Sequence, residues 1–72
     1  MSIEDIRGLR NAKPFAPFVI FTNDGRSIHV LARERLGLAP WGKVGVFEGT
    51  DFHLLAPADI DHVQIEELPE QK

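Results

Sequence analysis

The first ten residues have the hydrophobic pattern of a short amphipathic helix. Apolar side chains recur at every third position and fall on one stripe, made by Ile3, Ile6 and Leu9. Ser2 is placed to cap the helix, and Asp5 follows three residues later, where a capping box usually has Glu or Gln. A helix this short is not stable alone. The pattern therefore predicts a helix within residues 1–11 whose apolar stripe packs on the rest of the fold.

From Phe15 onward, short apolar stretches are bounded by Gly, Pro, Asn and Asp, which is typical of β-strands joined by tight turns. The stretch 18–22 is apolar on both faces and predicts a strand buried on two sides, one of which the helix can cover. The dipeptide Asp24-Gly25 predicts a tight type I′ hairpin turn, with positive φ at both positions. The returning strand, 27–30, alternates polar and apolar residues.

The middle of the chain predicts a bent strand path followed by a turn. Charged residues over 32–35 interrupt the alternating pattern, which resumes over 36–40. We interpret the interruption as a bend or bulge between two halves of one path. The segment 39–42 has Pro at its second and Gly at its fourth position, as in a type I turn.

Two further strands are predicted on either side of a turn at 48–51. The first, 43–48, directs Val44 and Val46 inward. In the second, Phe52 and Leu54 alternate with a histidine and a leucine, and we expect the histidine to face outward.

The last strand, 62–66, follows a tight connection at 56–59 that can include one 3₁₀ turn, and it directs Val63 and Ile65 inward. Residues 68–72 contain a proline and several charges, which predicts a frayed tail.

One helix and five or six short antiparallel strands in this order predict a mainly β fold. We expect a small, strongly bent antiparallel barrel with a short N-terminal helix, because closure removes most exposed strand edges. The alternative is an open sheet with the helix across one face. In the barrel interpretation, residues 1–72 form a single domain, with the helix in 1–11, the barrel in 15–67 and the tail in 68–72.

Composition limits the core and the environment. A chain of 72 residues is near the margin of stability, and oligomerisation is a common remedy. The absence of cysteine excludes disulfides and Cys-based zinc sites and fits a reducing compartment. The longest apolar run, 18–21, is too short for a membrane span or a signal peptide. We expect a soluble, cytoplasmic protein with no membrane partner. The net charge of −3 argues against nonspecific nucleic-acid binding.

The order of the predicted elements resembles that of the Sm-like small barrel. The segment FVIFTNDGRSIHV, residues 18–30, is similar to the opening of Sm-like proteins, where a strand, an Asn-Gly or Asp-Gly turn and a second strand follow the helix. The chain departs from this family at both RNA-pocket motifs. The Asp-x-apolar-Asn motif would fall at residues 32–36, which read ARERL, and the Arg-Gly motif would fall at 56–59, which read APAD. The resemblance therefore implies the fold and not the RNA pocket.

The segments SIEDIR and KPFAPFVIFTNDGRSIHV are also similar to a group of short, uncharacterised bacterial proteins. These have a Pro-Phe-x-Pro-Phe stretch before an Asp-Gly-Arg hairpin. This resemblance supports the fold and implies no mechanism.

Residues able to do chemistry are few and scattered. The histidines, His29, His53 and His62, all fall at outward positions of predicted strands and lack the spacing of a known metal motif. The two serines have no His and acid in a recognisable arrangement. Asp59 and Asp61 are predicted to shape the turn before the last strand. We therefore predict no catalytic residue, no metal site and no cofactor, and expect that the protein is not an enzyme.

Four residues are candidates for contact with a partner: Trp41, Arg33, Arg35 and Phe21. Trp41 is hard to bury locally in its turn, so it either covers the mouth of the barrel or anchors a partner, since Trp and Arg are enriched in binding hot spots. Arg33 and Arg35 flank Glu34, a mixed cluster more typical of an ion-pair network than of a phosphate-binding surface. Phe21 belongs to the strand that is apolar on both faces.

These patterns favour a non-enzymatic interaction module that assembles with itself or with a larger protein partner. We expect the contact to use an apolar strand edge, because residues 18–21 are apolar on both faces. The alternative is an Sm-like RNA-binding oligomer whose inner surface is basic although the net charge is negative. The missing pocket motifs count against nucleic acid as the partner.

Overall fold

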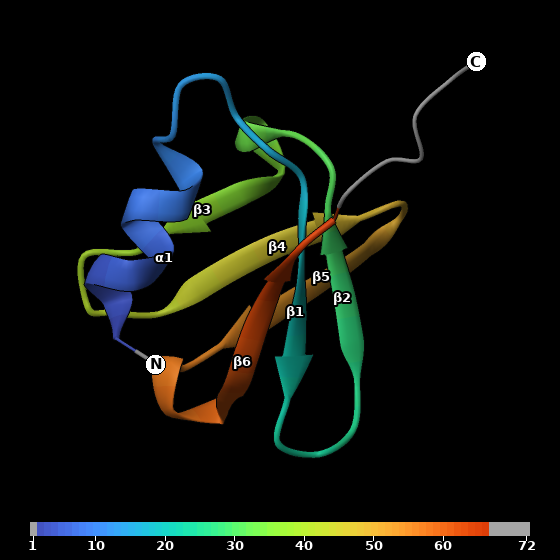
Figure 1. Cartoon of the computed structure of the whole chain (residues 1–72). Helices are drawn as coiled ribbons and strands as arrows, with labels where there is room; N and C mark the ends of the chain where they lie inside the picture. The colour runs from blue at the N-terminus through green and yellow to red at the C-terminus, as the bar shows by residue number, and fades with distance from the viewer. Residues whose placement is uncertain (1, 67–72) are drawn as a thin grey trace.

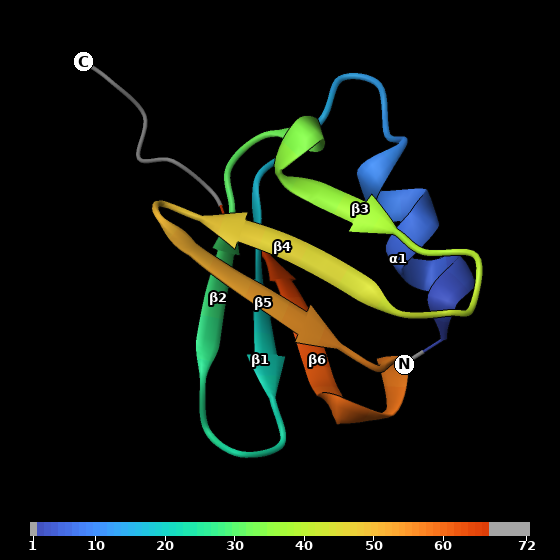
Figure 2. The ribbon, with the colours of Figure 1, turned by 180° about the vertical axis from the view of Figure 1, so that it is seen from behind.

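Residues 2–66 of the computed structural model contain one α-helix, two 3₁₀ turns and six strands (Figures 1 and 2). In chain order they are α1 (Ile3–Arg10), β1 (Phe18–Thr22), β2 (Ser27–Val30), η1 (Arg33–Arg35), β3 (Leu36–Leu38), β4 (Val44–Glu48), β5 (Asp51–Leu55), η2 (Pro57–Asp59) and β6 (Ile60–Ile65). The mainly β class and the short N-terminal helix are as the sequence predicts. The predicted tail, 68–72, lies outside the described residues.

The six strands pair in two antiparallel sheets. Sheet A has the order β2-β1-β6, and sheet B has the order β3-β4-β5. Figure 1 shows sheet A in front of sheet B, and Figure 2 shows sheet B from its outer side. Each sheet directs one face to a shared core and the other face to the surface.

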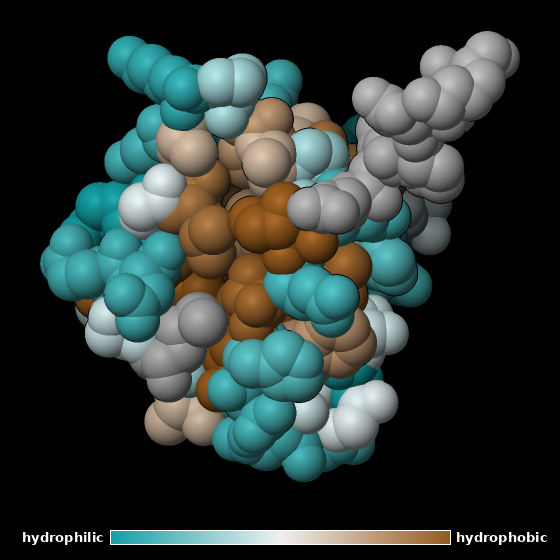
Figure 3. All heavy atoms as spheres, viewed as in Figure 1, coloured by the Kyte–Doolittle hydropathy of each residue, from teal (hydrophilic) through white to brown (hydrophobic). Residues whose placement is uncertain are grey.

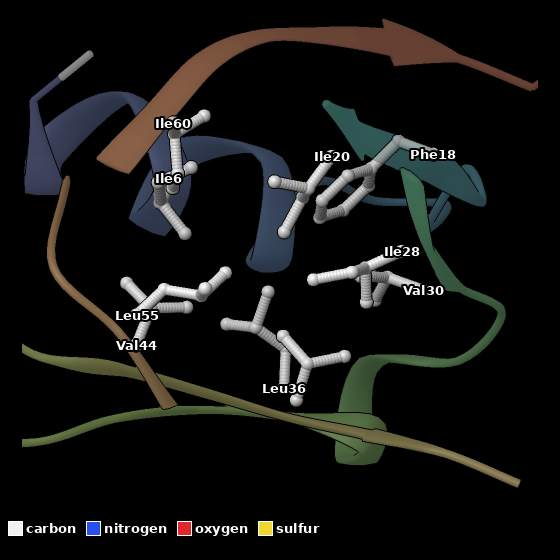
Figure 4. Close-up of a cluster of buried hydrophobic side chains, with 10 residues drawn as sticks. Ile6, Phe18, Ile20, Ile28, Val30, Leu36, Val44, Leu55 and Ile60 are labelled. Atoms are coloured by element: carbon white, nitrogen blue, oxygen red, sulfur yellow. The ribbon is translucent and has the colours of Figure 1, made fainter. Parts of the chain in front are cut away.

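The core is built from both sheets and the helix. Ten buried apolar side chains form one cluster, nine of which are labelled in Figure 4. Sheet A contributes Phe18, Ile20, Ile28, Val30 and Ile60, and sheet B contributes Leu36, Val44, Val46 and Leu55. Burial of this apolar area is the main favourable contribution to folding in a chain of this size.

The helix α1 is specified locally at its start and anchored by its apolar stripe. The backbone N–H of Asp5 donates to Ser2 Oγ at 3.3 Å, and the Ser2 N–H donates to Asp5 Oδ2 at 3.4 Å, which completes the predicted capping box. Ile6 is fully buried and points between Ile60 of sheet A and Leu55 of sheet B (Figure 4). The helix therefore packs against core residues of both sheets.

Two 3₁₀ turns carry the chain between the sheets. The predicted bend at 32–35 is the turn η1, which leads from β2 in sheet A to β3 in sheet B. The predicted turn at 56–59 contains η2, which returns the chain to β6. Asp59 Oδ2 accepts from the Ala56 N–H at 3.0 Å, as the sequence predicts for this acidic residue. Asn23 Nδ2 donates to the Ala58 carbonyl at 2.8 Å and ties this turn to the β1–β2 hairpin.

The β1–β2 hairpin is present, but its predicted type I′ turn is wrong. Gly25 has φ of 91°, whereas none of the described non-glycine residues, Asp24 included, has positive φ. The Gly25 N–H donates to the Thr22 carbonyl at 3.1 Å, as in a type I turn followed by a glycine bulge. The Thr22 hydroxyl donates to the Asp24 carboxylate, and Arg26 Nε donates to it at 3.1 Å. These contacts hold Asp24 at negative φ and lower the pKa of its carboxyl.

The predicted orientation of β5 is also wrong. Its Leu55 is buried and His53 is mostly covered, whereas Phe52 and Leu54 are exposed. The reason is the short β4–β5 turn, which pairs Glu48 with Asp51 and thereby places His53 opposite Val46 and Leu55 opposite Val44. Residues opposite one another share a face, so the inward valines of β4 bring His53 and Leu55 inward as well.

Candidate functional site

The outer face of sheet B has a group of large apolar side chains that other residues do not cover. Trp41, Phe47, Phe52 and Leu54 are 74%, 52%, 54% and 59% exposed. We refer to these four residues as the aromatic face. Single exposed apolar residues are common on protein surfaces, whereas a contiguous group of this kind is typical of an interaction surface.

Strand register brings these side chains together. Phe47 lies directly opposite Phe52, with ring centroids 4.8 Å apart at an angle of 50°. The next positions along the outer face are Gly37, Gly45 and Leu54, which are paired across the three strands. The two glycines leave a bare floor beside the aromatic rings, and the result is a shallow hollow of about 350 Å³.

Phe52 rests directly on this glycine floor. A Cβ atom at Gly45 would lie 3.0 Å from Phe52 Cζ and 3.1 Å from Cε1, closer than normal packing permits. The absence of a side chain at Gly45 therefore lets the ring lie against the backbone of β4. The strand pairing and this contact hold the Phe47–Phe52 pair in place.

Trp41 is presented by the turn between β3 and β4. The Gly42 N–H donates to the Ala39 carbonyl at 3.0 Å and Gly42 has φ of 86°, which agrees with the predicted type I turn and a glycine bulge after it. Trp41 lines the hollow together with the phenylalanines, but most of its side chain stays exposed. Trp41 is therefore not buried over a barrel mouth.

Arg33 binds backbone carbonyls and does not belong to the predicted ion-pair cluster. Its Nε donates to the Arg10 carbonyl at 2.8 Å and its Nη2 donates to the Ala12 carbonyl at 2.7 Å, so it caps the end of α1. Its guanidinium also lies 5.7 Å from the centre of the Phe15 ring. Within residues 2–66, neither Arg33 nor its neighbours Glu34 and Arg35 form an ion pair.

The other two predicted partner residues lie on different sides of the molecule. Arg35 is exposed and lines a second hollow beside Phe47, next to the aromatic face. Phe21 lies on the outer face of sheet A, where its ring stacks on His62 with centroids 4.5 Å apart. The strand that contains Phe21 is the central strand of sheet A, so the expectation of an apolar strand edge at 18–21 is wrong. The structure thus places Trp41 and Arg35 near one surface and Arg33 and Phe21 elsewhere.

The sequence interpretation missed Phe47, Phe52 and Leu54 as surface residues. In β5, the pair Phe52 and Leu54 is more apolar than the pair His53 and Leu55. The alternating pattern therefore predicts that Phe52 and Leu54 face the core, which is wrong. Gly37 and Gly45 could have indicated this surface. Glycines on the same side of neighbouring strands leave that side without side chains that could cover the residues beside them.

Glu48 joins the two sheets at the far end of β4. Its Oε2 accepts from the backbone N–H of His29 in β2 at 2.9 Å, and its Oε1 lies 3.2 Å from His53 Nε2. The backbone hydrogen bond from His29, with a smaller contribution from His53, lowers the pKa of the Glu48 carboxyl. On the other side, His29 Nδ1 lies 3.4 Å from Glu66 Oε1. His53 is therefore turned toward the interior, whereas the sequence predicted an outward position.

None of the described residues form a group of three or more side chains able to hold a metal ion. Within residues 2–66, no helix has the length and apolar character needed to cross a membrane. Figure 3 shows apolar surface over sheet A as well. There Ile65 is 43% exposed, whereas Val19 is only 9% exposed and Phe21 is partly covered.

Comparisons of the chain with protein-family models, with curated proteins and with solved structures find no match of any of the three kinds.

Proposed function

We propose that this protein is a non-enzymatic association module and that the aromatic face is the surface through which it binds another protein chain. The observation that carries this proposal is that four large apolar side chains on one face of sheet B are each more than half exposed. Interfaces are enriched in aromatic residues and depleted of charge at their centres, and the aromatic face has this composition.

The rigidity of the aromatic face supports the same function. Phe47 and Phe52 project from paired strands and contact each other, and Phe52 also rests on the backbone at Gly45. Side chains that are already held in place lose little conformational entropy on binding, so more of their contact energy contributes to affinity.

An Sm-like small barrel is the architecture that we propose for the two sheets. The path β1-β2-η1-β3-β4-β5-η2-β6 has the strand order expected from the resemblance, and the bend at η1 lets β2 and β3 act as two halves of one path. The hydrogen bond from the His29 N–H to Glu48 connects the sheets next to this bend.

RNA binding by an Sm-like oligomer has less support as a function. Arg33, one of two arginines at the bend, uses its guanidinium to bind the Arg10 and Ala12 carbonyls. Phosphate recognition needs several cations that are free to contact the backbone of the nucleic acid. The net charge of −3 is also unfavourable for that contact.

A photo-crosslinking experiment with matched positions tests the proposed function. A benzophenone analogue of phenylalanine replaces Phe52 on the aromatic face in one variant and Phe21 on the outer face of sheet A in the other. We expect irradiation in cells of the native host to join the chain to protein at position 52 and not at position 21. Failure to trap protein at position 52, in a variant that keeps the circular dichroism spectrum of the wild type, would overturn the proposal.

A further inference from the structure

We infer that the partner bound by the aromatic face is a second copy of the same chain, packed face to face about a two-fold axis that crosses the strands near Gly45. This inference rests on the proposed function and specifies its partner. Three features of sheet B support it: the shape of the face, the placement of its charges and the area that it exposes.

The shape of the aromatic face is complementary to itself. The Phe47–Phe52 pair lies two residues to one side of Gly45, toward the β4–β5 hairpin, and the turn with Trp41 lies at the other end, near α1 (Figure 2). A two-fold rotation near Gly45 exchanges these ends. It brings Trp41 of one copy onto the phenylalanines of the second copy. Phe52 already covers Gly45, and the open floor at Gly37 admits the rings. By symmetry every such contact is made twice.

Lys43 and Glu34, at opposite ends of the face, are complementary under the same rotation, and Arg35 at the Glu34 end lines the neighbouring hollow and not this one. Lys43 precedes Val44 and shares the outer side of the strand with Gly45, toward the Trp41 end. Glu34 lines the hollow from η1, which precedes β3 at the Phe47 end. Within the described residues neither side chain has an ion-pair partner. Antiparallel stacking places Lys43 of each copy near Glu34 of the other.

The exposed area agrees with a reversible dimer. Given their exposed fractions, the four side chains of the aromatic face present roughly 400 to 500 Å² of apolar surface. Two copies therefore bury roughly 800 to 1,000 Å² in total through these side chains, at the lower limit for a specific interface. Two sheets that stack through apolar faces also form the ordinary layer arrangement of β-sandwiches. A chain of 72 residues gains stability from such burial.

Sedimentation equilibrium from about 1 µM to about 1 mM tests the inference, because this range covers the dissociation constants of weak, reversible dimers. Trp41 is the single tryptophan of the chain, so its fluorescence reports the same equilibrium. We expect a monomer–dimer transition accompanied by a blue shift of the emission. A chain that is monomeric over the whole range would overturn the inference.

A charge exchange between two variants shows whether the contact joins two copies in the inferred orientation. In Lys43→Glu and in Glu34→Lys, each homodimer brings like charges together, and we expect each to dissociate about tenfold more readily than the wild type. In an equimolar mixture, the introduced glutamate of the first variant meets the introduced lysine of the second across the interface. The mixture should therefore dimerise within about twofold of the wild type.

The exposed Lys13→Glu variant is the control for the change in net charge and should behave as the wild type. A mixture no stronger than either variant alone would contradict the antiparallel arrangement.

The crosslinking at position 52 separates failure of this inference from failure of the proposed function. A product with twice the mass of the chain supports both. A product with a different protein, together with a monomeric purified chain, overturns the second copy as the partner but leaves the association function standing. Absence of any product at position 52 overturns both.

Discussion

The two sheets both carry apolar residues on their outer faces but surround them differently. On sheet A, Val19 lies between His29 and Gln64, and Phe21 lies between Ser27 and His62, so polar neighbours cover much of each apolar side chain. On sheet B, Phe47 and Phe52 lie opposite each other and Leu54 lies opposite Gly45, so the paired neighbours of these residues are apolar or lack a side chain.

The comparison shows that the neighbours across the strands, more than the apolar residue itself, decide whether an outer face is available to a partner. Cross-strand pairs are the unit of packing on a sheet. A histidine or glutamine beside a phenylalanine or valine shields it, whereas a glycine does not. The two faces therefore differ in the apolar contact that they offer, although both carry large apolar residues.

Removal of a ring from the shared core should lower the free energy of unfolding far more than removal of a ring from the aromatic face. Phe18→Ala removes a fully buried ring from sheet A and should lower the free energy of unfolding by about 3 to 5 kcal/mol. Phe47→Ala removes a half-exposed ring from sheet B and should cost less than about 1 kcal/mol. Urea denaturation at low protein concentration, where the chain is monomeric, measures both. Equal losses would mean that Phe47 stabilises the monomer as much as a core residue does.

A second comparison is between the two arginines of the connection that joins the sheets. Arg33→Ala should lower the free energy of unfolding by about 2 kcal/mol, because it removes two charged hydrogen bonds to the end of α1. Arg35→Ala, at an exposed position, should change it by less than about 0.5 kcal/mol. Thermal denaturation followed by circular dichroism distinguishes the two. A neutral Arg33→Ala would show that the helix does not depend on this cap.

The glycine floor of sheet B provides a matched pair of substitutions. Gly45→Ala should destabilise the monomer by about 1 kcal/mol and weaken association, because the new Cβ displaces the Phe52 ring. Gly37→Ala has open space around its Cβ and should be neutral or slightly stabilising. The measurements are urea denaturation and the dimer dissociation constant. If Gly37→Ala and Gly45→Ala behave alike, the contact of Phe52 with the strand backbone is not what holds the ring.

The contact of Glu48 between the two sheets should make a small contribution to stability that depends on pH. A carboxyl whose pKa is lowered by folding stabilises the protein above its unfolded pKa, here 4.5, and this contribution is lost as the pH falls through the folded value. The stability difference between wild type and Glu48→Gln should be about 1 kcal/mol at pH 7 and should vanish in acid. Asp61→Asn, which removes an exposed partner of His62, is the control and should leave the stability unchanged. A difference that persists in acid would show that the Glu48 charge does not act in this link.

Much of the local structure could be predicted because neighbouring residues determine it. Contacts within a few residues form the Ser2–Asp5 capping box and the Pro-containing turn before Gly42, and they also form the 3₁₀ turn in which the Arg35 N–H donates to the Ala32 carbonyl. The position of the hairpin at Asp24-Gly25 is confirmed but its type is not, since contacts of the Asp24 carboxylate with side chains on both sides select a conformation that the dipeptide alone does not specify.

The candidate site was predicted only in part. Trp41 was recognised from its place in a turn, but the role of Arg33 depends on the end of a helix more than twenty residues away in the chain. The alternating pattern of β5 could not predict which side faces inward. The side with Phe52 and Leu54 is the more apolar one, but the pairing with β4 directs the side with Leu55 to the core.

Residue type and short-range contacts are enough to specify the helix start, the positions of the turns, the mainly β class and the absence of cysteine chemistry. Contacts between distant parts of the chain select the side of β5 that faces the core, and with it the residues that form the aromatic face. The physical reason is that the inward side of a strand is chosen by its pairing with the valines of β4 and by packing across two sheets.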